Sequence, residues 1–266
     1  MNKIYWDNFC IETTRRCNMR CAHCMRGEPQ NLDMNSTYIE EIFKNTAYIG
    51  VIHFGGGEPT LNIPILKETL KLAKKYNIIV LNIDIITNGK EVPDEFIDII
   101  KQWKIYCNLF NSDQQEGLYL TIDPFHEKIN LKNIEKIIKN DFAEIRLDRY
   151  RPSGSLIIDK ENKTKSTYIV DCGRARTLKG YEKLPWNVKE DPPTVYKYNN
   201  NYYVIAKTML SCNGFLLKHT VYEWISEDKI RFCYYTDVLN AFEKIAITPS
   251  EHLPFFNVFK DGRQEP

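Results

Sequence analysis

The chain has 266 residues, of which 43% are hydrophobic and 27% are charged, and these are ordinary values for a globular protein. Its formal net charge is +1, so no overall charge imbalance points to nucleic acid or to an anionic membrane surface. No apolar run is long enough to span a bilayer or to act as a signal peptide, and we expect a cytoplasmic protein with no membrane partner.

Strand and helix patterns alternate through the first 150 residues. Apolar alternation predicts strands over 8–14, 51–54, 78–86, 118–123 and 143–147. Apolar residues at helical spacing predict helices around 39–46, 66–73, 93–103 and 131–138. Thr37 and Glu40 are spaced as a capping box for the first helix. A repeat of about thirty residues is typical of parallel βαβ units, whose loops gather at one mouth in a parallel barrel.

The pattern changes after residue 151. Residues 151–193 are polar and irregular. Residues 195–205 predict a hairpin that turns on consecutive asparagines, and residues 209–217 predict a strand pair that turns at Asn213-Gly214. A last helix is predicted over about 236–245.

Three cysteines follow the first predicted strand, at spacings of four and three residues that form no helical stripe: Cys17, Cys21 and Cys24. A compact loop of thiolates suits iron–sulfur or zinc. A cubane cluster has four irons, so three cysteines leave one iron open to a substrate or cofactor. The alternative is zinc held by these cysteines and one histidine, namely His23, His53 or His126.

Three more motifs follow the next strands. Gly55-Gly-Gly-Glu58-Pro59 combines glycines that allow close backbone approach with a carboxylate that can accept from an ammonium group. Thr87-Asn88-Gly89 offers hydroxyl and amide groups to a ribose, and Thr121-Ile-Asp123 follows the fourth strand. Each is also compatible with an ordinary turn.

Together, in this order, these motifs resemble the radical S-adenosylmethionine (radical SAM) superfamily over residues 8–150. The resemblance implies that Cys17, Cys21 and Cys24 bind one [4Fe-4S] cluster. It also implies that the SAM methionine amino group meets the motif formed by Gly56, Gly57, Glu58 and Pro59.

The same resemblance assigns further SAM contacts. Thr87 and Asn88 would meet the ribose, Thr121 and Asp123 would add polar contacts, and Arg149 or Arg151 would pair with the carboxylate. His23 stands where the family often has an aromatic residue beside adenine. The implied reaction is reductive cleavage of SAM to methionine and a 5′-deoxyadenosyl radical, which takes hydrogen from a substrate.

The resemblance also implies an electron donor such as flavodoxin or ferredoxin. Four arginines around the cysteine loop could dock such an acidic partner or could simply be solvated charges: Arg15, Arg16, Arg20 and Arg26.

The second half offers weaker signals. Cys172, Cys212 and Cys233 are scattered without a close pair, which favours a single cluster over a second one. His126 and Glu127 are candidates for acid–base work, although a surface turn followed by a helix start is the favoured explanation. Tyrosines of the predicted hairpin could cover a substrate or pack a sheet face.

We therefore expect an α/β protein, a partial (β/α)6 radical SAM barrel with a small C-terminal α+β extension. Residues 1–150 would form the core barrel, and residues 151–266 would complete the barrel and add a hairpin and helix extension. A peptide or small protein is the first substrate expected. The alternatives are a nucleotide or small metabolite, a glycyl-radical activating enzyme, and a non-catalytic zinc or iron–sulfur protein.

Overall fold

The structure is a computed structural model, and it describes residues 2–111, 117–122, 125–147, 156–158, 165–180, 182–184, 192–220 and 222–249. Its helices and strands are, in chain order, β1 (Ile4–Thr14), α1 (Ser36–Asn45), β2 (Thr46–Gly56), η1 (Pro59–Asn62), α2 (Ile63–Lys75), β3 (Ile79–Thr87), α3 (Asp94–Asn108), β4 (Leu118–Ile122), α4 (Leu131–Ile138), β5 (Ala143–Leu147), β6 (Leu156–Ile158), β7 (Lys165–Val170), η2 (Gly173–Thr177), β8 (Glu182–Leu184), β9 (Val195–Tyr198), β10 (Asn201–Val204), β11 (Thr208–Leu210), β12 (Phe215–Leu217), η3 (Trp224–Ile230), β13 (Arg231–Tyr234) and α5 (Val238–Ile245). No helix among these residues is long and apolar enough to cross a membrane.

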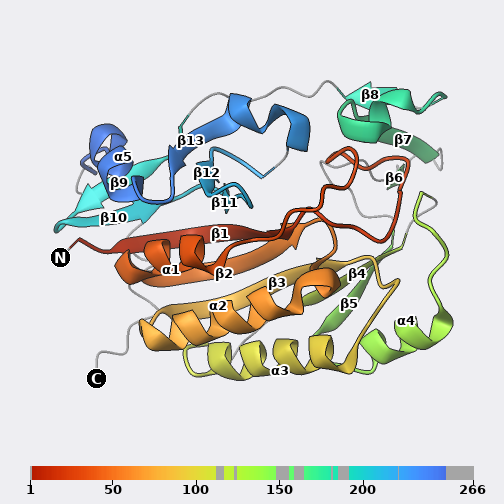
Figure 1. Ribbon diagram of the computed structural model, residues 1–266, viewed down its shortest axis with the longest axis horizontal. Coiled ribbons are helices and arrows are strands. Elements are labelled where there is room, and N and C mark those ends of the chain that lie inside the picture. The colour runs from red at the N-terminus through yellow and green to blue at the C-terminus, as the bar shows by residue number, and fades with distance from the viewer. Residues whose placement is uncertain are drawn as a thin grey trace.

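A large, mostly parallel sheet organises the chain, with strands in the order β13-β12-β11-β1-β2-β3-β4-β5. Strands β1 to β5 are parallel neighbours in sequence order. Figure 1 shows α1, α2 and α3 along one side of these strands. This confirms the expected α/β fold with parallel βα units. A sixth βα unit is not found among the described residues, because short strands follow β5 there.

The C-terminal strands extend this sheet past β1. Strand β10 pairs in parallel with the start of β1, and β11 pairs in parallel with its middle. The predicted hairpin of β9 and β10 is confirmed, and Asn199 and Asn200 both have positive φ, as a tight two-residue hairpin turn requires. The turn at Asn213-Gly214 between β11 and β12 is also confirmed. The N-terminal strand therefore lies inside the sheet.

Helix packing follows the predicted apolar spacing. Ile39, Ile42 and Phe43 of α1 are buried in the main core, which lies between the helices and the sheet. The predicted capping box is wrong, because Asn35 is the N-cap and its side chain accepts from the Thr37 N–H. Glu40 lies instead near Lys75, which donates to it at 2.7 Å.

Residues 151–193 were expected to be irregular, and this is wrong in part. A small three-stranded sheet has the order β6-β7-β8, and η2 follows β7. Figure 1 shows this sheet beside the loop that leaves the carboxyl end of β1.

Candidate functional site

The cysteine loop leaves the carboxyl end of β1. Cys21 is buried, while Cys17 and Cys24 are partly exposed, and all three are free thiols. The Cys24 N–H donates to the Cys21 carbonyl at 3.1 Å, which closes a tight turn inside the loop. All three line one cavity of about 240 Å³. The loop thus presents its thiols to a common space.

Most of the predicted site residues line this same cavity. These are Cys17, Cys21, His23, Cys24, Gly56, Gly57, Glu58, Thr87, Asn88, Thr121 and His126, and they are joined by Met25, Arg26, Gly55 and Ile86. They come from the carboxyl ends of β1 to β4, where ligand sites of parallel α/β folds are found.

Two predicted residues that the structure describes, Pro59 and Glu127, are not on this lining. Pro59 is buried at the start of η1. Glu127 lies outside the lining, where it accepts from the Arg20 N–H at 3.0 Å and pairs with Lys90 at 2.5 Å. Asp123 and Arg149 lie outside the described residues, as does the alternative Arg151.

The glycines after β2 allow the chain to pass very close to β1. The Gly57 N–H donates to the Thr14 carbonyl at 2.7 Å. Gly56 has φ +113°, and a Cβ added to Gly57 would overlap the Arg16 carbonyl oxygen. These contacts hold the loop after β2 against the start of the cysteine loop. The close packing of this loop against the end of β1 therefore explains both glycines, in addition to the predicted approach of a ligand.

Glu58 joins the loops after β2 and β3. Its carboxylate is 1% exposed and accepts from Thr87 Oγ1 at 2.7 Å, from Asn88 N at 2.8 Å and from Thr60 N at 3.2 Å. Burial raises the pKa of Glu58 above its usual value. The sequence predicts this carboxylate as a ligand for an ammonium group. The structure shows that it also positions Thr87 and Asn88.

Asn88 connects this pair of loops to the cysteines. Its Nδ2 donates to Asn18 Oδ1 at 2.9 Å and lies 3.9 Å from Cys17 Sγ. On the next strand, Thr121 lines the cavity, and its buried Oγ1 has no hydrogen-bond partner within the described part of the chain. A buried hydroxyl without a partner suits a site completed by a polar ligand.

An aromatic group stands at the edge of the cavity. The His23 ring centroid lies 5.0 Å from that of Phe125 and 5.2 Å from that of His126. His23 and His126 both line the cavity. Flat rings at this position suit a planar ligand group.

Comparison with known proteins decides the family. Residues 11–147, about half of the chain, match the family model described as "Radical SAM superfamily". The chain belongs to the radical SAM superfamily. A sequence relative described as GTP 3′,8-cyclase, from Clostridium acetobutylicum, is 25% identical over 207 residues, which cover 69% of this chain and 62% of the relative. The chain therefore spans less than two thirds of the length of that relative.

Solved structures support the radical SAM fold. The structure of anSMEcpe with bound AdoMet matches with a TM-score of 0.53 and 14% identity, over 89% of this chain and 80% of that one. Native anSMEcpe with bound AdoMet and Cp18Cys peptide also matches with a TM-score of 0.53, at 13% identity and the same coverage. Membership in this family implies a [4Fe-4S] cluster and SAM.

The donor set fits the cluster of a radical SAM protein better than it fits zinc. Among the described residues, no three His, Cys, Asp or Glu side chains lie close enough together to hold one metal ion. Zinc needs its donors around a single point, whereas a cubane spreads its thiolates over separate irons. His53, on β2, has other partners, because its Nδ1 lies 2.8 Å from Asp84 Oδ2 and its Nε2 lies 2.8 Å from Asn8 Oδ1.

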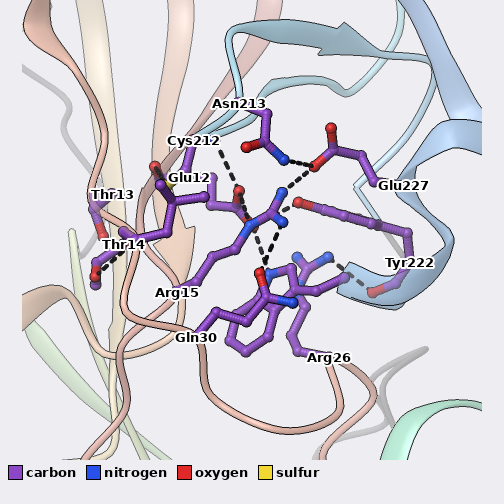
Figure 2. A network of polar contacts seen from close by, with 12 residues as sticks. Glu12, Thr13, Thr14, Arg15, Arg26, Gln30, Cys212, Asn213, Tyr222 and Glu227 are labelled. Carbon is purple, nitrogen blue, oxygen red and sulfur yellow. Dashed lines mark hydrogen bonds and ion pairs between the residues drawn. The ribbon is translucent and has the colours of Figure 1, made fainter.

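A buried polar network joins the carboxyl end of β1 to the C-terminal segment (Figure 2). Glu12 on β1 is fully buried and accepts from Arg15 Nε at 2.9 Å, from Tyr222 Oη at 2.5 Å and from Trp224 Nε1 at 2.7 Å. Arg15 also pairs with Glu227. Burial alone would raise the pKa of Glu12, but nearby cationic and hydrogen-bond donors outweigh it and lower the pKa.

This network includes two of the four arginines that were candidates to dock an electron donor. Arg15 is 2% exposed, and Arg26 is buried against the ring of Tyr222, 4.4 Å from its centroid. Arg16 and Arg20 are more open and pair with Asp33 and Glu28. Two of the four arginines therefore cannot meet a partner protein, and their burial is a feature that local sequence reasoning missed.

The remaining cysteines lie in separate places. Cys212 Sγ lies 3.1 Å from the Glu12 carbonyl oxygen, and Cys172 Sγ lies 3.6 Å from the Met25 carbonyl oxygen. Cys233 lies on β13. Burial raises the pKa of Cys172 and of Cys233 to about 12. Buried thiols with raised pKa values are typical of structural cysteines.

Proposed function

We propose that Cys17, Cys21 and Cys24 bind a single [4Fe-4S] cluster and that SAM occupies the adjoining cavity. The observation that carries this proposal is the convergence on one cavity of the three thiols, the Glu58 network and the Thr121 hydroxyl, which has no partner among the described residues. Three thiolates leave one iron of a cubane open, and SAM would bind there.

Individual residues have defined tasks in this proposal. Gly56, Gly57, Glu58 and Pro59 shape the wall for the methionine amino group. Thr87, Asn88 and Thr121 offer polar groups to the ribose, and His23 offers a flat ring to adenine. Asp123 and Arg149 stay in the proposed set as predictions from the sequence.

Arg26 is an addition that the sequence motifs did not suggest. Among the described residues on the cavity lining, it is the one Arg or Lys. A guanidinium pairs well with a carboxylate, so Arg26 is a candidate to meet the SAM carboxylate.

When bound and reduced, the cofactor pair would supply a carbon radical that abstracts hydrogen from the substrate. The chain's own residues do the positioning. The Glu58 bonds hold Thr87 and Asn88 at the wall, and the close packing of Gly56 and Gly57 on β1 fixes that wall beside the cysteine loop. Met25 and Ile86 add apolar surface that limits access of water.

The domain proposal follows from the origin of these residues. All described residues on the cavity lining lie between Cys17 and His126, within the proposed core of residues 1–150. Residues 151–266 would complete and support that core. A low-potential donor such as flavodoxin or ferredoxin would supply the electron.

For the substrate, we retain a peptide or small protein as the first proposal. Its support is the fold match to anSMEcpe, one of whose structures is named with a bound peptide. A nucleotide is the second candidate, because the sequence relative is described as a GTP 3′,8-cyclase. A catalytic role for His126 or Glu127 toward either substrate stays a prediction.

The test is anaerobic reconstitution with iron and sulfide, followed by SAM and dithionite. We expect iron bound to the chain and formation of methionine and 5′-deoxyadenosine. The variant with Cys17, Cys21 and Cys24 all changed to Ala should lose both, whereas Cys233→Ala, which removes a thiol remote in the fold, should keep both. An iron-free protein, or an iron protein that leaves SAM intact, would support a non-catalytic binding protein instead.

Adding GTP to the same reaction separates the two substrate candidates. Consumption of GTP together with faster formation of 5′-deoxyadenosine would favour the nucleotide. If GTP is not consumed and 5′-deoxyadenosine forms at the same rate, GTP is excluded as the substrate and the peptide remains the proposed substrate.

A further inference from the structure

The segment that begins at Cys172 lies directly against the cysteine loop. The Arg174 N–H donates to the Cys24 carbonyl at 2.9 Å, and Arg174 Nε donates to the Cys21 carbonyl at 3.0 Å. Gly173 has φ +58°, and a Cβ there would overlap the carbonyl oxygens of Cys24 and Met25. One residue from the C-terminal half thus binds the backbone of two predicted cluster ligands.

Neighbouring contacts hold Arg174 in this position. The carboxylate of Glu223, which is buried, accepts from the Gly173 N–H and pairs with Arg176 at 2.8 Å. The backbone N–H of the next residue, Trp224, donates to the Arg26 carbonyl at 3.2 Å. Segments η2 and η3 therefore contact each other and the end of the cysteine loop, and the backbone of Arg174 is fixed relative to the thiols.

The Arg174 charge is poorly screened by water. Its side chain is 16% exposed, and its ion pair with Glu28 is long, at 3.4 Å. Arg20 offers a natural contrast, since it pairs with the same Glu28 at 2.6 Å but is 74% exposed. Charges at an exposed position are screened far more strongly than charges held against the protein interior.

We propose that Arg174 is a positioning residue for the cluster, which stabilises its reduced form and slows its loss from the chain. This rests on the proposed function of the cysteine loop. Reduction by a one-electron donor adds one negative charge to the cluster and its thiolates. A nearby cation therefore raises the reduction potential, and groups around metal ligands commonly tune a metal in this way.

Three variants test the inference by EPR-monitored potentiometric titration of the reconstituted protein. Arg174→Gln should lower the midpoint potential of the cluster, and Arg174→Lys, which keeps the charge, should stay closer to the wild type. Arg20→Gln removes an exposed charge beside the same Glu28 and should leave the potential unchanged. Equal potentials in Arg174→Gln and the wild type would overturn the inference, as would an equal shift in Arg20→Gln.

Iron release to a chelator provides a second readout. Arg174→Gln should lose iron faster than the wild type and faster than Arg20→Gln, while its iron-free form melts at the wild-type temperature. If the iron-free variant melts much earlier, Arg174 is a general packing residue and the inference fails. If the wild type itself binds no [4Fe-4S] cluster, the proposed function fails. If the wild type cleaves SAM, and Arg174→Gln has the midpoint potential and the rate of iron release of the wild type, this inference fails and the proposed function stands.

Discussion

Glu58 illustrates how one buried carboxylate can organise a ligand site without facing solvent. Three donors from two loops surround it, and two of them belong to Thr87 and Asn88, the residues proposed to meet the ribose. Losing one acceptor leaves a buried donor unsatisfied, which costs about 1–3 kcal/mol. The geometry of the ribose wall therefore depends on this side chain.

At this scale we predict that Glu58→Gln weakens both the fold and SAM binding. In the wild type, the Glu58 carboxylate accepts from Thr87, Asn88 and Thr60. The amide NH2 of the variant cannot accept, so one of these buried donors loses its partner and the unfolding free energy should fall by about 1–3 kcal/mol. Equilibrium dialysis should show a higher Kd for SAM. The matched control, Glu95→Gln, changes an exposed carboxylate paired with Lys67 and should match the wild type in both measurements. Wild-type stability and affinity in Glu58→Gln would refute the role assigned to this carboxylate.

Single residues are predicted unevenly by the sequence. The motif spacing predicts that Cys17, Glu58 and Asn88 lie at one site, because each follows a strand whose end can be recognised, and the three residues do line one cavity. It cannot show that Glu58 bonds Thr87, because such a bond depends on the register between neighbouring strands. Arg15 shows the same limit, since charged residues are usually exposed and its partner Glu227 lies far away in sequence.

Among the elements, the loop after β2 is fixed by its approach to β1. Gly57 passes so close to Arg16 that no side chain fits between them, whereas a Cβ on the neighbouring Gly55 would meet only Met209 Cε, at 4.0 Å. These two glycines are only two positions apart in the sequence but have different steric requirements.

We therefore predict different effects on stability for the substitutions Gly57→Ala and Gly55→Ala. Gly57→Ala forces a backbone shift and should lower the unfolding free energy by at least about 1–3 kcal/mol, the usual cost of overpacking. Gly55→Ala should leave it within about 1 kcal/mol, because an added methyl group there has room. Denaturant unfolding of both variants measures the difference. Equal stability of the two variants would contradict the close approach of Gly57 to β1.

Elements are predictable where a periodic pattern or a turn signal marks them in the sequence. Strand β5 has the predicted bounds, and the hairpin turn at Asn199 and Asn200 follows from residues that tolerate positive φ. Strands β6 and β8 have three residues each, too few to show a period. Their pairing with β7 is set by tertiary contacts that no local pattern records.

The whole molecule is joined by the buried network between β1 and the C-terminal segment (Figure 2). Glu12 accepts hydrogen bonds from Cys212 N, Tyr222 Oη and Trp224 Nε1, all of them about 200 residues away. Because the core and extension share this carboxylate, we expect them to unfold together rather than separately.

The lowered pKa of Glu12 has a consequence for acid stability. Its pKa is below the usual 4.5 in the folded state, so the unfolded state binds the proton more tightly. The stabilising contribution is complete above pH 4.5 and is lost as the pH falls through the folded pKa. Glu12→Gln should lose about 3–5 kcal/mol at neutral pH and show a weaker pH dependence in the acid range.

Urea unfolding at a series of pH values measures this effect. The control Glu68→Gln, which changes a carboxylate paired with Lys71 on the surface of α2, should match the wild type at neutral pH. A Glu12→Gln variant with the wild-type slope below pH 4.5 would show that this carboxylate does not couple folding to acid.

We propose above all that the protein leaves one iron of the cluster open and that SAM binds to this iron. EPR spectroscopy of the anaerobically reduced protein, recorded before and after addition of SAM, tests this most directly. We expect a [4Fe-4S] EPR signal whose shape changes when SAM binds. The variant with Cys17, Cys21 and Cys24 all changed to Ala should lack this signal. A signal that SAM leaves unchanged, or a protein that retains its cluster without these three cysteines, would contradict this proposal.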